Sequence, residues 1–274
     1  MSGPYPLGPR PEGRFVPRCG LLARVAITAI HLSPHPDDEA IGAPATLLAL
    51  RAAGHRVINV ACGLGRPDQV RRREAELREA CARGGLELVV LDPQLECSRV
   101  ADWVAAHIVE DDVDLVVSPS PHDGHRGHEL VGRAAREGIA RSGRGTRWWA
   151  WGLWADLPLP TLVTEFGEAR MADVLAMLAA HAGELDRNDY AALVRCRAVA
   201  HRILGAERVF GFGSAGLDGP YAELLTELGV HGGRWMAYEP RRLDAASPLS
   251  GAPGERSLSW WLDEPSFRDR LGWS

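Results

Sequence analysis

The chain has 274 residues, of which 46% are hydrophobic and 24% are charged, a composition typical of a globular protein with enough chain for a buried core. Its formal net charge is −5, which gives no reason to expect nucleic acid or an anionic membrane as the main partner. All 31 basic residues are arginines. Because lysine is absent, Schiff-base chemistry, a lysine general base and a Walker-type phosphate loop are excluded.

The five cysteines are widely scattered and include no CxxC pair, so we expect reduced thiols rather than a disulfide framework or a cysteine zinc site. Residues 1–23 are rich in Pro and Gly and lack the apolar core of a signal peptide. No stretch approaches the roughly 20 apolar residues of a membrane span. We therefore expect a cytoplasmic protein with a Pro/Gly-rich N-terminal segment, followed over residues 24–274 by a single domain that becomes less regular from about residue 160.

From Arg24 onward, apolar stretches that predict strands alternate with stretches that predict helices. The predicted strands are Val25–Leu32, Arg56–Cys62, Leu86–Leu91, Asp114–Ser118 and Arg147–Trp154. The predicted helices are Glu39–Ala53, Pro67–Arg83, Val100–Glu110, Glu129–Arg141, Ala169–Ala182, Asp189–Leu204 and Tyr221–Leu228. This alternation predicts an α/β fold with a Rossmann-like, mostly parallel sheet and helices on both faces. Residues 237–258, rich in Pro, Ser, Ala and Gly, predict a surface loop.

Two segments rich in histidine and carboxylate follow predicted strands. The first reads HLSPHPDDE over residues 31–39 and places one imidazole and three carboxylates between His35 and Glu39. The second, SPSPHDGHRGHE, follows the fourth predicted strand and contains His122, Asp123, His125 and His128. Because functional sites in open α/β sheets lie at the carboxyl ends of the strands, we expect the two segments to face each other.

These residue types point to a metal-assisted hydrolysis. His35 and Asp38 can supply two of the three protein ligands of a catalytic zinc, and one histidine of the second segment completes the set. The metal makes a bound water acidic, and Asp37 can accept its proton. A nearby imidazole can polarise a substrate carbonyl or protonate a leaving amine, so the assembly predicts amide hydrolysis. The simpler interpretation, a helix start at Asp37 or Asp38, is disfavoured by the second histidine segment.

Four of the nine tryptophans form one short run, Trp148, Trp149, Trp151 and Trp154. Core packing is the simpler interpretation, and an aromatic wall for a sugar or an aromatic ligand is the functional one. The glycine-rich stretches at 62–67 and 211–216 do not have the GxGxxG spacing after the first strand. A nucleotide-binding Rossmann module is therefore disfavoured.

The two segments resemble the motifs of the LmbE-like family, which includes the zinc-dependent N-acetylglucosaminyl-phosphatidylinositol and mycothiol-precursor de-N-acetylases. The family motif [AP]HPDDE is intact at Pro34–Glu39, and the second family motif, HxDH, is best matched by HRGH at His125–His128. The resemblance extends loosely over about residues 24–228. The resemblance implies these roles: zinc ligands His35, Asp38 and His128; general base Asp37; assisting imidazole His125; substrate contacts Arg73 and Asp92.

Gly127 departs from the family, which usually has at this position an Asp that orients the assisting imidazole. Asp123 is a candidate substitute. If HDGH at 122–125 were the motif instead, His125 would be the ligand. We favour His128, because Val131-Gly132 then lies at the family spacing.

The resemblance thus implies a zinc-dependent hydrolase, with another divalent ion as an alternative, that removes an acetyl or related acyl group from an N-acylated glucosamine moiety. The favoured substrate is a glycopeptide-antibiotic pseudoaglycone. The alternatives are a mycothiol-pathway deacetylase, a thiol-conjugate amidase, or a non-catalytic carbohydrate-binding protein on the same scaffold. The expected partner is a small molecule, with no nucleic acid and no transmembrane segment.

Overall fold

The structure is a computed structural model that describes residues 26–91 and 95–272. Its strands are β1 (Thr28–Ser33), β2 (Arg56–Ala61), β3 (Glu87–Val90), β4 (Leu115–Pro119), β5 (Arg147–Trp151), β6 (Leu162–Phe166), β7 (Tyr221–His231), β8 (Arg234–Tyr238), β9 (Arg241–Arg242) and β10 (Pro253–Ser257). Its helices are α1 (Asp38–Ile41), α2 (Pro44–Ala52), α3 (Val70–Gly84), α4 (Cys97–Glu110), α5 (Arg126–Ser142), α6 (Glu168–Leu178), α7 (Ala182–Leu185), α8 (Tyr190–Phe210), α9 (Ser259–Asp263) and α10 (Phe267–Leu271).

The strands form one sheet in the order β10-β8-β7-β5-β4-β1-β2-β3, with β6 and β9 joined to it through β7. In the half that contains β3, β2, β1, β4 and β5, all neighbouring strands are parallel. These strands are short apolar runs because each is covered on both faces. The predicted α/β class is confirmed, and an antiparallel extension of β7, β8 and β10 continues the sheet beyond β5.

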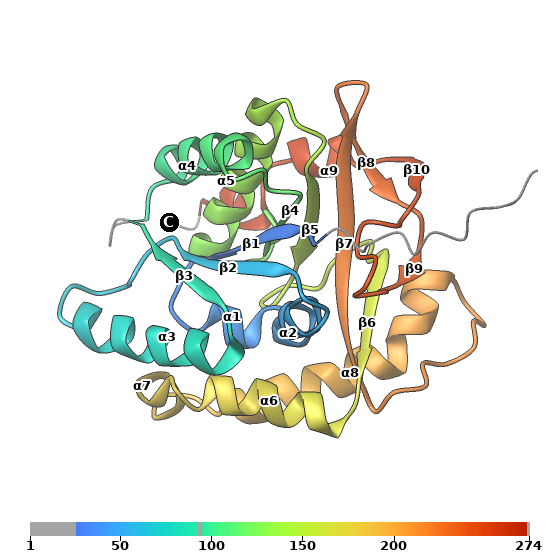
Figure 1. The fold of residues 1–274 in the computed structure, drawn as a ribbon. Coiled ribbons are helices and arrows are strands. Elements are labelled where there is room, and N and C mark those ends of the chain that lie inside the picture. The colour runs from blue at the N-terminus through green and yellow to red at the C-terminus, as the bar shows by residue number, and fades with distance from the viewer. Residues whose placement is uncertain (1–25, 92–94, 273–274) are drawn as a thin grey trace, which may run out of the picture.

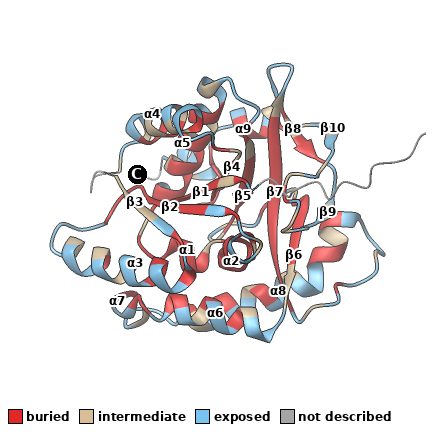
Figure 2. Ribbon diagram, in the orientation of Figure 1, coloured by how far each residue is buried: buried red, intermediate tan, exposed pale blue. Residues whose placement is uncertain are grey.

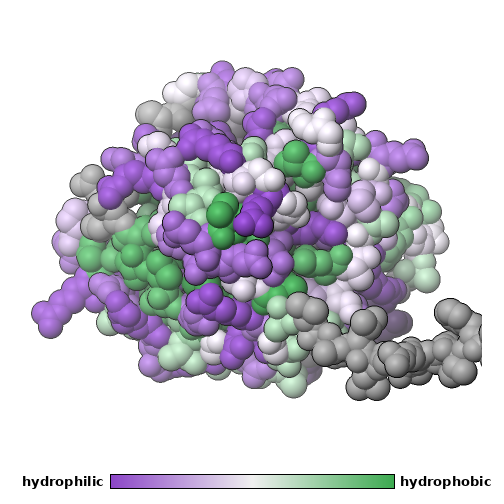
Figure 3. Space-filling view, turned by 45° about the horizontal axis from the view of Figure 1, so that its top comes forward, coloured by the Kyte–Doolittle hydropathy of each residue, from purple (hydrophilic) through white to green (hydrophobic). Residues whose placement is uncertain are grey.

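Helices cover both faces of the sheet, with α4 and α5 on one side and α3 and α6 on the other (Figure 1). Alternate residues of β1 show why two cores form: Ala29 belongs to the cluster under α2 and α6, whereas Ile30 and Leu32 pack against α4 and α5. Figure 2 shows the central strands buried and the outer faces of the helices exposed. Figure 3 shows one face on which hydrophilic residues predominate and hydrophobic residues gather in a few patches. No helix within the described ranges is long and apolar enough to cross a bilayer.

The prediction of a helix at Tyr221–Leu228 is wrong, because this segment is the first part of strand β7. Its leucines, Leu224, Leu225 and Leu228, have a spacing that resembles a helix face. In the structure β7 pairs with β5, β6 and β8 and is buried on both sides, so a polar–apolar alternation does not develop.

Three other predicted ranges differ from the structure. The predicted helix Glu39–Ala53 is interrupted between α1 and α2, because Gly42 packs against Trp151 and Pro44 starts a new helix. The predicted helix Ala169–Ala182 already ends at Leu178. The predicted loop 237–258 contains β9 and β10, which pair with β6 and β8. The proposed N-terminal segment 1–23 lies outside the described residues, and the single-domain organisation stays a prediction.

The packing of α2 provides a test of the fold. Leu47 is fully buried in the core beneath this helix, whereas Leu204 on α8 is half exposed. We expect Leu47→Ala to lower the free energy of unfolding by about 2–5 kcal/mol, because it leaves a cavity. Leu204→Ala makes the same chemical change and should cost less than about 0.5 kcal/mol. Denaturant unfolding of both variants measures the difference, and equal costs would contradict the placement of α2.

Candidate active site

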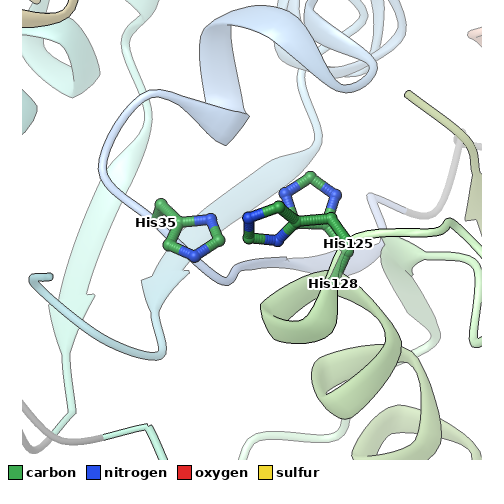
Figure 4. A group of neighbouring side chains, drawn as sticks. All are labelled: His35, His125 and His128. Atoms are coloured by element: carbon green, nitrogen blue, oxygen red, sulfur yellow. The ribbon is translucent and has the colours of Figure 1, made fainter. Parts of the chain in front are cut away.

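Three histidines converge at the carboxyl edge of the parallel strands. Strands β1 and β4 are direct neighbours, so the segments that follow them meet. Figure 4 shows His35 on the segment after β1 and His125 and His128 at the beginning of α5, with their rings close together. One nitrogen of each ring lies within 4.8 Å of the other two, a spacing that fits a shared metal ion.

Asp38 adds a carboxylate to this cluster. Its oxygens lie 3.2 Å from His35 Nδ1 and 3.2 Å from His128 Nε2, and the backbone N–H of His35 donates to it at 2.7 Å. Burial opposes ionisation of Asp38, but attraction to His128 and His35 outweighs it and holds the pKa of this carboxyl well below its usual value. Imidazole nitrogens together with an ionised carboxylate are a donor set that suits zinc, so these residues fit a metal.

Asp123 orients His128. Its Oδ2 lies 2.7 Å from His128 Nδ1, and its Oδ1 accepts the backbone N–H groups of Leu153 at 2.5 Å and Trp154 at 3.2 Å. A buried carboxylate on the far nitrogen of a histidine fixes the tautomer and direction of a metal ligand. Burial lowers the pKa of His128, but Asp38 and Asp123 together raise it to about 10. Asp123 therefore orients His128. It does not orient His125, for which it was the candidate from the sequence.

Asp37 has an unusual backbone. Its φ of 137° lies in the region that favours glycine, and a residue held there stores strain, a feature that clusters at functional sites. Its Oδ1 lies 3.9 Å from Nη2 of Arg73. Burial and the neighbouring charge of Asp38 raise the pKa of Asp37 well above its usual value, and Arg73 opposes this. A carboxyl group with a raised pKa in a cavity is a candidate general base.

Arg73 lies behind the first motif. Its Nη2 donates to the carbonyl of Pro36 at 3.1 Å, and its Nε lies 3.4 Å from Glu184. The guanidinium is buried and holds the backbone that leads to Asp37. Asp92, the other predicted substrate contact, lies outside the described residues.

A cavity of about 230 Å³ opens over the cluster. It brings together six of the residues chosen from the sequence, namely His35, Asp37, Asp38, Arg73, His125 and His128. The cavity is also lined by Ile41, Leu153, Trp154, Arg187 and Tyr190. A larger cavity of about 840 Å³, near β8, β10 and the end of α8, contains none of the predicted site residues.

Arg187 and Tyr190 could not be predicted from the sequence, because no motif marks them and they lie far along the chain from both histidine segments. The tryptophan run divides at the end of β5: Trp148, Trp149 and Trp151 on the strand are core residues, and Trp154, beyond the strand, is 57% exposed at the cavity. The Trp154 ring stacks on His125 with centroids 5.5 Å apart.

Among residues 26–91 and 95–272, no carboxylate forms a hydrogen bond with His125. Its Nδ1 is buried without a hydrogen-bond partner among the described residues. Burial, followed by the charges of His128 and His35, lowers the pKa of His125 to about 4, so its ring is neutral near neutral pH. A Cβ at Gly127 would lie 2.7 Å from His35 Nε2, so the His35 ring occupies the space next to this glycine.

The close contact at Gly127 predicts a metal-binding defect. Gly127→Ala should displace the His35 ring and weaken zinc affinity by roughly 10–100-fold, the range for disturbing the groups that orient a ligand. Gly145→Ala is the matched control, since a Cβ there meets no atom within 4 Å. Competition with a chromogenic chelator measures both affinities. Equal affinities in the two variants would show that His35 does not ligate the metal from its present position.

The fold and this cluster define an α/β protein with a candidate divalent-metal site at the carboxyl edge of its parallel strands. Residues 30–139 match the PIG-L family, described as GlcNAc-PI de-N-acetylase. This match over residues 30–139 confirms the predicted resemblance and supports the expected class of enzyme, a hydrolytic N-deacetylase. No curated protein matches the chain significantly.

Solved structures share the fold at low sequence identity. A zinc-inhibited form of teicoplanin deacetylase is 15% identical with a TM-score of 0.56, over 75% of this chain and 99% of that chain. A pseudoaglycone deacetylase for an antimicrobial reagent is 18% identical with a TM-score of 0.55, over 74% and 96%. The 4-carboxy-2-hydroxymuconate hydratase of Pseudomonas putida is 17% identical with a TM-score of 0.59, over 75% and 97%. Identities this low establish the fold, and the hydratase shows that the fold also serves other chemistry.

Proposed function

We propose that the protein is a zinc-dependent hydrolase that removes an acetyl or related acyl group from an N-acylated glucosamine moiety. The observation that carries this proposal is the cluster in which ring nitrogens of His35, His125 and His128 lie within 4.8 Å of one another and Asp38 contacts both His35 and His128. The strained Asp37 lines the same cavity. A divalent ion other than zinc would suit the same donors. A cytoplasmic location and a small-molecule partner stay part of the proposal.

In this mechanism His35, Asp38 and His128 hold the metal. When bound, the metal supplies Lewis acidity that polarises a carbonyl and makes water acidic. Asp37 accepts the proton of the attacking water and then delivers it to the leaving amine. His125 is neutral, so it donates a hydrogen bond to the developing oxyanion instead of carrying a charge. Arg73 keeps the Asp37 segment in place through the Pro36 carbonyl.

The favoured substrate is a glycopeptide-antibiotic pseudoaglycone. The site cavity of about 230 Å³ is smaller than a typical drug-sized pocket, so it suits one acylated sugar whose attached group stays outside. The exposed ring of Trp154 offers an apolar face beside the cavity for a sugar or an aromatic ring. The match to a GlcNAc-type de-N-acetylase and the likeness to two antibiotic-related deacetylases support this choice.

Mass-spectrometric detection of deacylation tests the proposal. A panel of N-acetylglucosaminyl compounds, including a glycopeptide pseudoaglycone, is incubated with the protein with and without a chelator. Chelator-sensitive loss of the acyl group is the expected result, and the pseudoaglycone should be the best substrate. If protein shown to carry metal releases no acyl group from any compound, the proposed activity is wrong.

Three alternatives are separated by further experiments. A cysteine-conjugate panel distinguishes a mycothiol-pathway deacetylase or a thiol-conjugate amidase. A non-catalytic carbohydrate-binding protein is favoured by one observation, the absence of a carboxylate partner for His125 in the described chain. Such a protein would bind the sugar in calorimetry and release no amine.

A further inference from the structure

Behind the cavity lies a buried pair that joins two distant parts of the chain. Glu39, the last residue of the first motif, and His181, which immediately precedes α7, are both 0% exposed. His181 Nε2 lies 2.5 Å from Glu39 Oε1, across a sequence separation of 142 residues. Neither side chain lines the cavity, so the catalytic roles proposed above leave this pair unexplained.

Glu39 connects the pair to the candidate base. While Oε1 of Glu39 contacts His181, its Oε2 accepts the backbone N–H of Asp37 at 3.2 Å. This N–H belongs to the residue whose φ is 137°. A strained backbone persists only where its surroundings hold it, and the Glu39 carboxylate is one such restraint.

His181 contacts the other oxygen of the Glu39 carboxylate. The other ring nitrogen of His181, Nδ1, is buried and has no hydrogen-bond partner among the described residues. Within the described part of the chain, the hydrogen bond of this imidazole is therefore the one with Glu39. A buried carboxylate without its partner is costly, so loss of the imidazole would favour movement of the Glu39 side chain.

We propose that His181 is a positioning residue: it fixes Glu39, and Glu39 holds the backbone of Asp37 in the conformation that directs its carboxylate into the cavity. This inference rests on the proposed function, in which Asp37 moves the proton. The competing interpretation is that the pair only fastens α7 to the first motif. The two interpretations differ in whether kcat depends on the hydrogen bond itself.

Two substitutions of His181 separate these interpretations. His181→Gln keeps an N–H donor near the position of Nε2, whereas His181→Met fills the space without a donor. We expect His181→Met to lower kcat by roughly 10–100-fold with little change in KM or metal content, because a shift of about 1 Å in a reacting group costs on this order. His181→Gln should recover most of this loss.

His55 supplies the matched control. Like His181 it is a buried histidine, but both of its ring nitrogens form hydrogen bonds. It lies at the opposite end of α2 from the site. His55→Met should reduce stability without changing kcat. A double variant adds a second check, since His181→Met should cause little further loss in the Asp37→Asn background if it acts through Asp37.

Crystallography of His181→Met gives a result that does not depend on activity. A relaxed, negative φ at Asp37 supports the proposal, and an unchanged φ together with wild-type kcat overturns it. If the wild-type protein hydrolyses none of the panel, the proposed function fails, and the φ of Asp37 in the variant still decides whether His181 positions it. Equal losses of kcat in His181→Gln and His181→Met would also overturn the proposal.

Discussion

Asp37→Asn should lower kcat by roughly 10²–10⁴-fold, the usual contribution of a general base, while the metal content stays that of the wild type. The amide has the shape of the carboxylate but cannot accept the proton of water. Asparagine also tolerates a positive φ better than most residues, so the segment before α1 should keep its conformation. Steady-state kinetics and metal analysis of the same preparation measure the two quantities.

The raised pKa of Asp37 predicts how kcat/KM and stability change with pH. In the wild type, kcat/KM should decrease as the pH falls through the pKa of Asp37, and this limb should be absent from the residual activity of Asp37→Asn. An acid whose pKa is higher in the folded than in the unfolded state loses stability as the pH rises between the two values. Near neutral pH, metal-free Asp37→Asn should therefore unfold at a higher denaturant concentration than the wild type.

Asp156→Asn provides the matched control for Asp37→Asn. It makes the same change at an exposed residue whose contact is with Arg208. Its kcat and pH profile should equal those of the wild type. Near-normal turnover in Asp37→Asn would remove Asp37 from the chemistry and leave its strained backbone without a catalytic explanation.

His128→Ala should abolish both metal binding and turnover. The residue contacts Asp38 and Asp123, so its loss removes a proposed ligand and one partner of each of two buried carboxylates. Metal affinity should fall by more than roughly 100-fold, beyond the effect typical of an outer partner. Isothermal titration with zinc measures the loss.

Two further variants, Asp123→Asn and His122→Gln, should affect zinc affinity less than His128→Ala does. Asp123 contacts His128 at the ring nitrogen that faces away from the metal site, so its replacement should weaken zinc binding by roughly 10–100-fold. His122 belongs to the same segment but packs beside Trp261, outside the site cavity, so its replacement should leave affinity unchanged. If His122→Gln weakened zinc binding as strongly as His128→Ala, the assignment of His128 as a ligand would be wrong.

Features of this protein that depend on short stretches of sequence could be predicted from the sequence, and features that depend on distant contacts could not. The strands of the parallel half are short apolar runs between helical segments, and their order in the chain is enough to predict their class. The two histidine segments were also predictable, because ligands on short segments after neighbouring strands come together in any open parallel sheet.

Two features depend on contacts between distant segments and could not be predicted: strand β7, and the position of Arg187 and Tyr190 at the cavity. In β7 two acidic residues have partners in the interior: Glu223 accepts the backbone N–H groups at the start of α2, and Glu227 pairs with Arg147 and Arg241. These partners come from distant segments and only tertiary structure reveals them. Arg187 and Tyr190 likewise reach the cavity because α7 and α8 fold back onto the first motif.

One carboxylate, Asp123, holds both a proposed metal ligand and the backbone that carries Trp154. Metal affinity and the position of this loop are therefore thermodynamically linked, and the coupling is reciprocal. A change at residues 153–155 made to alter the range of accepted substrates would also alter the hold on the metal. Directed evolution of this enzyme for new acyl sugars should accordingly select compensating changes around His128. The metal concentration during selection will determine which sequences at residues 153–155 are retained.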